Sequence, residues 1–110
     1  MNFDLKSFIS DLESLGTNIT TRIEQIYNNY SVVKLAESVE RINYLLQDMQ
    51  VLVDGVSRLI DQEVINVDLE EFNYYLNSML TELENENVST VCDILYFEIN
   101  PLLIEMKEEM

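Results

Sequence analysis

The sequence predicts an all-α protein, an antiparallel bundle of about four helices with a Pro-kinked C-terminal helix. Apolar residues recur in steps of three and four along most of the chain, which is the period of a helix face. The 110 residues include only two Gly and one Pro, too few for the turns of an all-β protein. With 47% apolar residues, the chain can bury a core of its own. Residues 1–110 are therefore expected to form a single helical-bundle domain.

The first helix is expected from about Asp4 to about Asn28. Gly16 weakens it by about 1 kcal/mol relative to Ala and permits a break at that point. The apolar phase nevertheless continues unshifted through Gly16, so a single helix is predicted. Its apolar face consists of Leu5, Phe8, Leu12, Leu15, Ile19, Ile23 and Ile26.

The stretch from Leu35 to Ile60 is expected to be the central helix. Its apolar residues alternate steps of four and three, which is a heptad pattern: Leu35, Val39, Ile42, Leu46, Met49, Val53, Val56 and Ile60. Leu45, Leu52 and Leu59 widen this face. A face that wide contacts two neighbours, which favours a bundle over a two-stranded coiled coil. Gly55 falls on the expected outer side.

The third helix is expected to start at Asn66 or Asp68, because Asp68 and Glu71 resemble a capping box. Tyr74 projects away from the apolar face and is expected to be exposed. The polar residues 84–87 separate this helix from the fourth, and linkers this short predict antiparallel neighbours. The buried face is predicted to be Leu69, Phe72, Leu76, Met79, Leu80 and Leu83.

The fourth segment carries two apolar surfaces. The expected core face is Val88, Val91, Leu95, Ile99, Leu102 and Met106. Phe97 and Ile104 lie nearly opposite this face, with Ile94 and Pro101 between the two. Pro101 donates no backbone hydrogen bond and its ring clashes with the carbonyl one turn back. Either one helix is kinked near Phe97, or Asn100 caps a new short helix that starts with Pro101.

Residues 93–105, with the sequence DILYFEINPLLIE, resemble the closing signature of a family of small, uncharacterised all-helical proteins from Gram-positive bacteria. In that signature an acidic residue and an apolar pair precede an aromatic-Glu-apolar triplet, and Pro and two Leu follow. Phe97 stands where Tyr is more usual. The resemblance implies a helical fold and a bacterial origin, and it implies no activity.

The net charge of −15 excludes several partners. The 21 carboxylates outnumber six basic residues, and no Lys or Arg occurs between Arg58 and Lys107. Binding to phosphate backbones or anionic headgroups requires clustered Lys and Arg. Neither nucleic acid nor a membrane surface is therefore expected as a partner. The charge is compatible with a solvated surface or with docking on a basic partner.

The expected compartment is the reducing cytoplasm. Cys92 is the only cysteine, so no disulfide can form within the chain. Residues 1–20 alternate charged and apolar residues, unlike a signal peptide. No apolar run approaches the ~20 residues of a membrane span.

The sequence predicts no catalytic, cofactor-binding or metal site, so the protein is not expected to be an enzyme or to carry a cofactor. The chain has no His, which removes the usual base for a Ser or Cys nucleophile and the usual ligands of zinc and di-iron sites. Cys92 is expected to pack as a small apolar residue. Glu98, inside an apolar run, is expected to be a surface residue or a hydrogen-bond partner of a Tyr.

Two functions remain. The first is a protein-protein interaction module, an adaptor or a chaperone-like binder, by analogy with the small acidic helical chaperones of secretion and flagellar export systems. Its partner would bind at Ile94, Phe97, Pro101 and Ile104. The alternative is a self-associating structural or regulatory homodimer without catalytic activity. The expected partner is thus another protein or a second copy of this chain.

Overall fold

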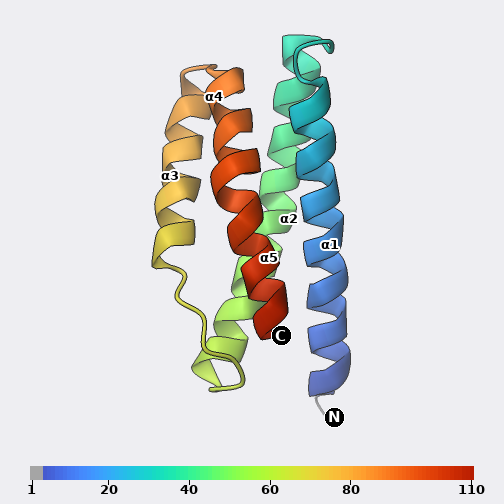
Figure 1. The fold of residues 1–110 in the computed structure, drawn as a ribbon, viewed down its shortest axis with the longest axis vertical. Helices are drawn as coiled ribbons and strands as arrows, with labels where there is room; N and C mark the ends of the chain where they lie inside the picture. The colour runs from blue at the N-terminus through green and yellow to red at the C-terminus, as the bar shows by residue number, and fades with distance from the viewer. Residues whose placement is uncertain (1–3) are drawn as a thin grey trace.

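The structure, a computed structural model, describes residues 4–110. Four helical rods run alternately up and down (Figure 1), and both chain ends lie at the same end of the bundle. They are α1 (Leu5–Asn29), α2 (Leu35–Asp61), α3 (Glu70–Glu84), and a fourth rod of three consecutive segments, α4 (Val88–Asp93), η1 (Ile94–Ile99) and α5 (Asn100–Glu109). The fourth rod is called the closing helix below. The predicted all-helical antiparallel bundle is confirmed.

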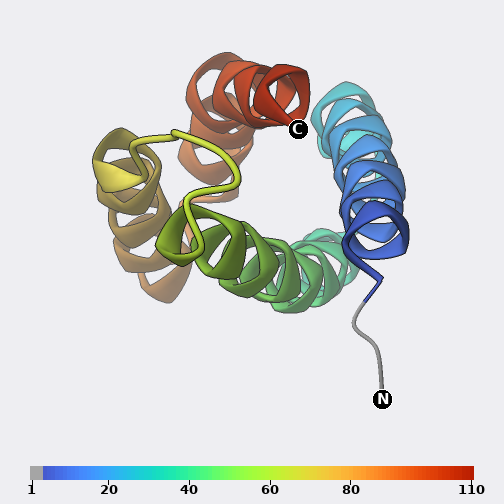
Figure 2. The same cartoon turned by 90° about the horizontal axis from the view of Figure 1, so that it is seen from below.

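The four rods surround one apolar core. Figure 2, along the bundle, shows them in the order α1, α2, α3 and closing helix, with α5 returning beside α1. Each rod contributes one face to this core, and the largest fully buried side chains come from all four: Ile19, Ile23, Ile42, Leu45, Met49, Leu52, Leu59, Phe72, Met79, Leu95, Ile99 and Leu103. No helix within residues 4–110 combines the length and the apolar character of a membrane span.

Helix α1 is unbroken, as predicted. At its start the Asp4 carboxylate accepts a hydrogen bond from the Ser7 backbone N–H at 3.1 Å, which satisfies one of the free donors of the first turn. Gly16 is buried beneath α5, where an added Cβ would lie 3.3 Å from Lys107 Cγ and Cδ. The Lys107 ammonium continues past it and donates to the Thr17 hydroxyl at 2.6 Å. Gly16 thus marks a close contact between α1 and α5.

Helix α2 has nearly the expected range, but the centre of its buried face differs. The most buried residues are Ile42, Leu45, Met49, Leu52, Val56 and Leu59, whereas Leu46 and Ile60 are half-buried at the edge. Gly55 is also buried, so the outer position expected for it is wrong. It faces Leu12 of α1, whose Cδ2 lies 2.5 Å from the position of an added Cβ. The missing side chain lets α1 and α2 approach closely.

Helix α3 starts at Glu70, later than predicted, and residues 62–69 form an extended connection. Asp68 does bond to the first turn, because its Oδ1 accepts from the Glu70 N–H at 2.9 Å, but Glu71 does not complete a capping box. Ile65 is only 8% exposed, so the connection is held against the bundle by a buried side chain. Tyr74 is 66% exposed, as predicted.

The closing helix stays continuous through Pro101. Asn100 has helical dihedral angles, φ −56° and ψ −47°, and makes no capping hydrogen bond, so the alternative of a new helix capped by Asn100 is wrong. Segment η1 is π-helical, and the Asn100 N–H donates to the carbonyl of Leu95, five residues back. Such a turn absorbs one extra residue beside a proline that offers no N–H to the carbonyl of Phe97. The helix is therefore perturbed where the kink was predicted.

The extra residue changes which side chains reach the core after Pro101. Leu103 is 1% exposed and takes the core position predicted for Leu102, which is only half-buried. Asn100 also turns inward and is 7% exposed. A π-helical turn rotates the following residues backward relative to an α-helix, which accounts for a shift of one position.

Candidate functional site

An apolar stripe runs along the outer face of the closing helix. It consists of Ile94, Phe97, Pro101 and Ile104 and is called the outer stripe below. Phe97 is 56% and Ile104 46% exposed, Pro101 is exposed, and Ile94 is half-buried. Other side chains of this helix fill the core, so Phe97, Pro101 and Ile104 are not required to close the bundle, whereas Ile94 packs against the edge of the core. All four sequence-predicted partner-binding residues are thus at least partly exposed on the closing helix.

A group of aromatic rings connects the outer stripe to the end of α1. Tyr27 stacks on Tyr96 with a centroid distance of 4.2 Å and an interplanar angle of 16°. Phe97 meets Tyr27 edge-on at 5.5 Å, and Tyr30 lies 6.2 Å from Tyr27. Aromatic pairs of this geometry stabilise by about 0.5–1.5 kcal/mol beyond their buried area. Helical spacing within single segments did not predict this group, although the antiparallel pairing of α1 with the closing helix places Tyr27 opposite Tyr96.

Glu98 is held by a tyrosine of α3. The Glu98 carboxylate, as hydrogen-bond acceptor and as a nearby negative charge, raises the pKa of Tyr75 above its ordinary value. This is the Tyr partner expected for Glu98. At the aromatic group, burial first and then the charge of Asp93 raise the pKa of Tyr27. Both phenols are therefore neutral at physiological pH, and both lie beside carboxylates of the closing helix.

Carboxylates surround the outer stripe. Asp93 lies one turn before Phe97, and Glu98, Glu105 and Glu108 are exposed along the same helix; Glu105 and Glu108 also line the cleft described below. These four residues are called the acidic rim below. The closing helix has one basic residue, the lysine that reaches over Gly16 to α1. The rim is consequently uncompensated within this helix.

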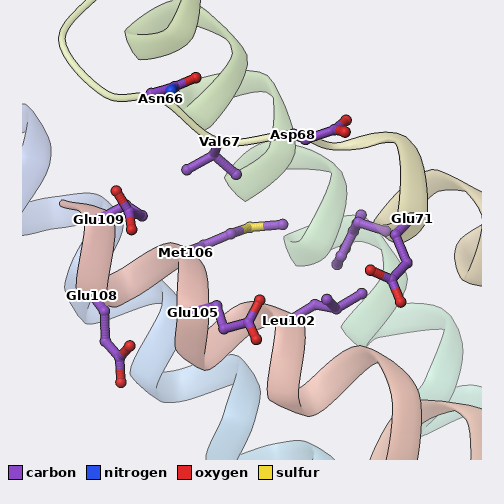
Figure 3. A pocket seen from close by; sticks show the side chains of 10 residues that line it. Asn66, Val67, Asp68, Glu71, Leu102, Glu105, Met106, Glu108 and Glu109 are labelled. Atoms are coloured by element: carbon purple, nitrogen blue, oxygen red, sulfur yellow. The ribbon is translucent and has the colours of Figure 1, made fainter.

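An acidic cleft of about 330 Å³ lies at the lower end of the bundle, between α5, the start of α3 and the extended connection. Figure 3 shows the Glu71 and Glu105 side chains on either side of Leu102, with Met106 beside them. Residues 4–110 contain no group of three or more His, Cys, Asp or Glu side chains placed to hold a metal ion. This cleft could not be predicted from the sequence, because it depends on the late start of α3.

A second hollow, of about 440 Å³, lies between α1 and α2 and is lined in part by Arg22, Arg41 and Tyr44. Both arginines are already paired: Arg22 bonds to Asp48, and Arg41 bonds to Glu37, one turn earlier on α2, at 2.7 Å. An anion entering this hollow would compete with these carboxylates. The hollow therefore offers weak attraction for a negatively charged ligand.

Cys92 is a buried free thiol. Burial, with a smaller contribution from the charge of Asp93, raises its pKa to about 11. A thiol that stays protonated and buried at neutral pH is a poor nucleophile. Cys92 thus packs as the small apolar residue that the sequence predicted.

The fold and the surface define a class first: an all-helical bundle domain with an exposed apolar stripe bordered by carboxylates. Within this class the chain belongs to the family described as Domain of unknown function (DUF8042), whose model matches residues 7–109. No solved structure gives a significant match to the chain.

Proposed function

We propose that this protein is a protein-protein interaction module, an adaptor or chaperone-like binder without catalytic activity, and that its partner binds at the outer stripe. The observation that carries the proposal is the exposure of Phe97 and Ile104 on a helix whose core face is already filled. Apolar side chains grouped on one helix face are typical of surfaces that bind a partner. The aromatic rings beside the stripe are of the residue type that is enriched at protein interfaces.

The chemistry of the chain supports binding over catalysis. Cys92 is a poor nucleophile because burial raises its pKa to about 11, and the chain has no His to act as a base. Glu98 is engaged with Tyr75. A cytoplasmic location in a bacterium is part of the proposal: the unpaired thiol is typical of reducing compartments, and the bacterial origin rests on the resemblance of residues 93–105.

The proposal is tested by selecting random peptides from a phage-displayed library on the immobilised protein. The bound pool is then offered three proteins: wild type, Phe97→Ser/Ile104→Ser, and Tyr74→Ser. Tyr74 is a matched control because it is an exposed aromatic on α3. The proposal predicts that the pool binds Tyr74→Ser like wild type and loses binding to the double variant. A pool that binds all three equally, or a library that yields no binders, contradicts it.

The alternative, a homodimer through the same stripe, is separated by light scattering over a dilution series. A wild-type dimer that becomes a monomer in Phe97→Ser/Ile104→Ser assigns the stripe to self-association. A monomer at every concentration supports a foreign partner. The single variants Phe97→Ser and Ile104→Ser are measured beside it, and circular dichroism verifies that each is helical.

A further inference from the structure

The charges around the outer stripe restrict what can cover it. A second copy of this chain would bring another net charge of −15 and a second acidic rim against the first. Like charges that face each other across an interface cost several kcal/mol. Repulsion therefore disfavours self-association at this surface and favours a partner that carries positive charge.

The area of the stripe supports the same choice. Phe97 is 56% and Ile104 46% exposed. The four side chains of the outer stripe together offer at most about 400 Å² of exposed apolar surface. Each partner in a stable interface buries about 800 Å². The apolar contact alone is thus about half of what a stable interface needs, so charge attraction must supply much of the affinity.

The aromatic group adds a second preference for cations. The Phe97 ring is more than half exposed, and its neighbours Tyr27 and Tyr96 lie within 5.5 Å between centroids. An ammonium or guanidinium group over such a ring gains about 0.5–1 kcal/mol at an exposed site. Asp93 lies close enough to Tyr27 to raise its pKa, so a carboxylate and aromatic faces are available to the same cation.

We infer that the outer stripe, with its acidic rim, binds a cationic amphipathic helix of another protein. Apolar residues of that helix, spaced by three and four, cover Phe97, Pro101 and Ile104, and flanking Lys or Arg side chains meet the rim carboxylates and the aromatic rings. This inference rests on the proposed function, and it adds the chemical class of the partner. An interface of this kind is transient and weakens as salt is added.

Three designed peptides test the inference by fluorescence anisotropy. They share the same apolar residues at helical spacing, and their flanking positions carry Lys, Gln or Glu. The Lys peptide is expected to bind the wild-type protein at least about tenfold more tightly than the Gln peptide, and the Glu peptide more weakly than both. This preference should shrink when salt is raised from about 0.05 to 0.5 M, because screening shortens the reach of each charge.

Three single neutralisations locate the charge that matters. Asp93→Asn removes a carboxylate of the acidic rim, Glu71→Gln removes one from the acidic cleft, and Glu40→Gln removes one from an exposed position on α2. Each reduces the net negative charge by one, from −15 to −14, so the long-range attraction for the Lys peptide falls equally in all three variants. Asp93→Asn is expected to weaken the Lys peptide about three- to fivefold. The other two are expected to weaken it by less than about twofold.

The outcomes separate the inference from the proposed function. If all three peptides bind alike and Phe97→Ser/Ile104→Ser binds none, the stripe is a binding surface without charge selection, and only the inference is overturned. If Phe97→Ser/Ile104→Ser and Ile104→Ser bind the Lys peptide like wild type, attraction is non-specific and both are overturned. An effect of Glu71→Gln equal to that of Asp93→Asn, or no binding of the Lys peptide, also overturns the inference.

Discussion

Replacing the same residue type at two positions of the closing helix tests whether the outer stripe is surface or core. Ile104 is 46% exposed, whereas Ile99 is fully buried. Burying a whole Ile side chain stabilises by about 1.5–3 kcal/mol, so Ile104→Ser forfeits about half of that, about 1 kcal/mol. Ile99→Ser forfeits all of it, leaves a cavity and buries a hydroxyl, which together cost about 4 kcal/mol or more.

Urea denaturation followed by circular dichroism measures both variants against wild type. For a domain whose total stability is about 5–15 kcal/mol, Ile104→Ser should shift the urea midpoint slightly at an unchanged m-value, and Ile99→Ser should lower the midpoint several times further. Phe97→Ser should fall between them, because Phe97 is 56% exposed but has edge contacts with Tyr27 and Tyr96. A loss for Ile104→Ser as large as that for Ile99→Ser would place Ile104 in the core and remove it from the proposed binding surface.

Three further predictions test the packing. Ser38 is 2% exposed and its hydroxyl has no hydrogen-bond partner among the described residues, so Ser38→Ala should raise the free energy of unfolding by about 1 kcal/mol; lower stability in urea would contradict this. Gly16→Ala should raise the free energy of unfolding by up to about 1 kcal/mol. Gly55→Ala should raise it only in the Leu12→Ala background, where the side chain 2.5 Å from the new Cβ is removed. Additive effects of Gly55→Ala and Leu12→Ala in a double-mutant cycle would refute the close contact. Burial raises the pKa of Cys92 from 9.0 to about 11, so the protonated thiol contributes fully to the free energy of unfolding below pH 9. This contribution is lost as the pH rises toward 11. The free energy of unfolding should therefore fall less steeply over this range in Cys92→Ala than in wild type.

The fold could be predicted from the sequence because the apolar period is strong in every rod. The second helix was expected over Leu35 to Ile60 and runs over Leu35–Asp61, since its wide apolar face has no competing signal. The start of α3 was predicted too early. Asp68 does bond to the first turn of α3, but the burial of Ile65 keeps the residues that precede Glu70 out of the helix. This tertiary contact has no local signature in the sequence.

Two features depend on neighbours in space and could not be predicted from helical spacing. Gly55 was read as an outer residue, yet it is buried because Leu12 occupies the space of its missing side chain. The π-helical turn moves the core position from Leu102 to Leu103, and the sequence indicated only that Pro101 would disturb the helix. Phe97 and Ile104 are both exposed, as their positions opposite the expected core face predicted.

The central claim is that the outer stripe receives a cationic partner, and an NMR titration of the isotopically labelled protein with the Lys peptide tests it most directly. The account predicts that the largest changes in backbone amide shifts lie at Ile94, Phe97 and Ile104 and at Tyr27 of α1, with small changes on the outer face of α2. Changes concentrated around Glu71 in the acidic cleft, or spread evenly over the acidic surface, would contradict it.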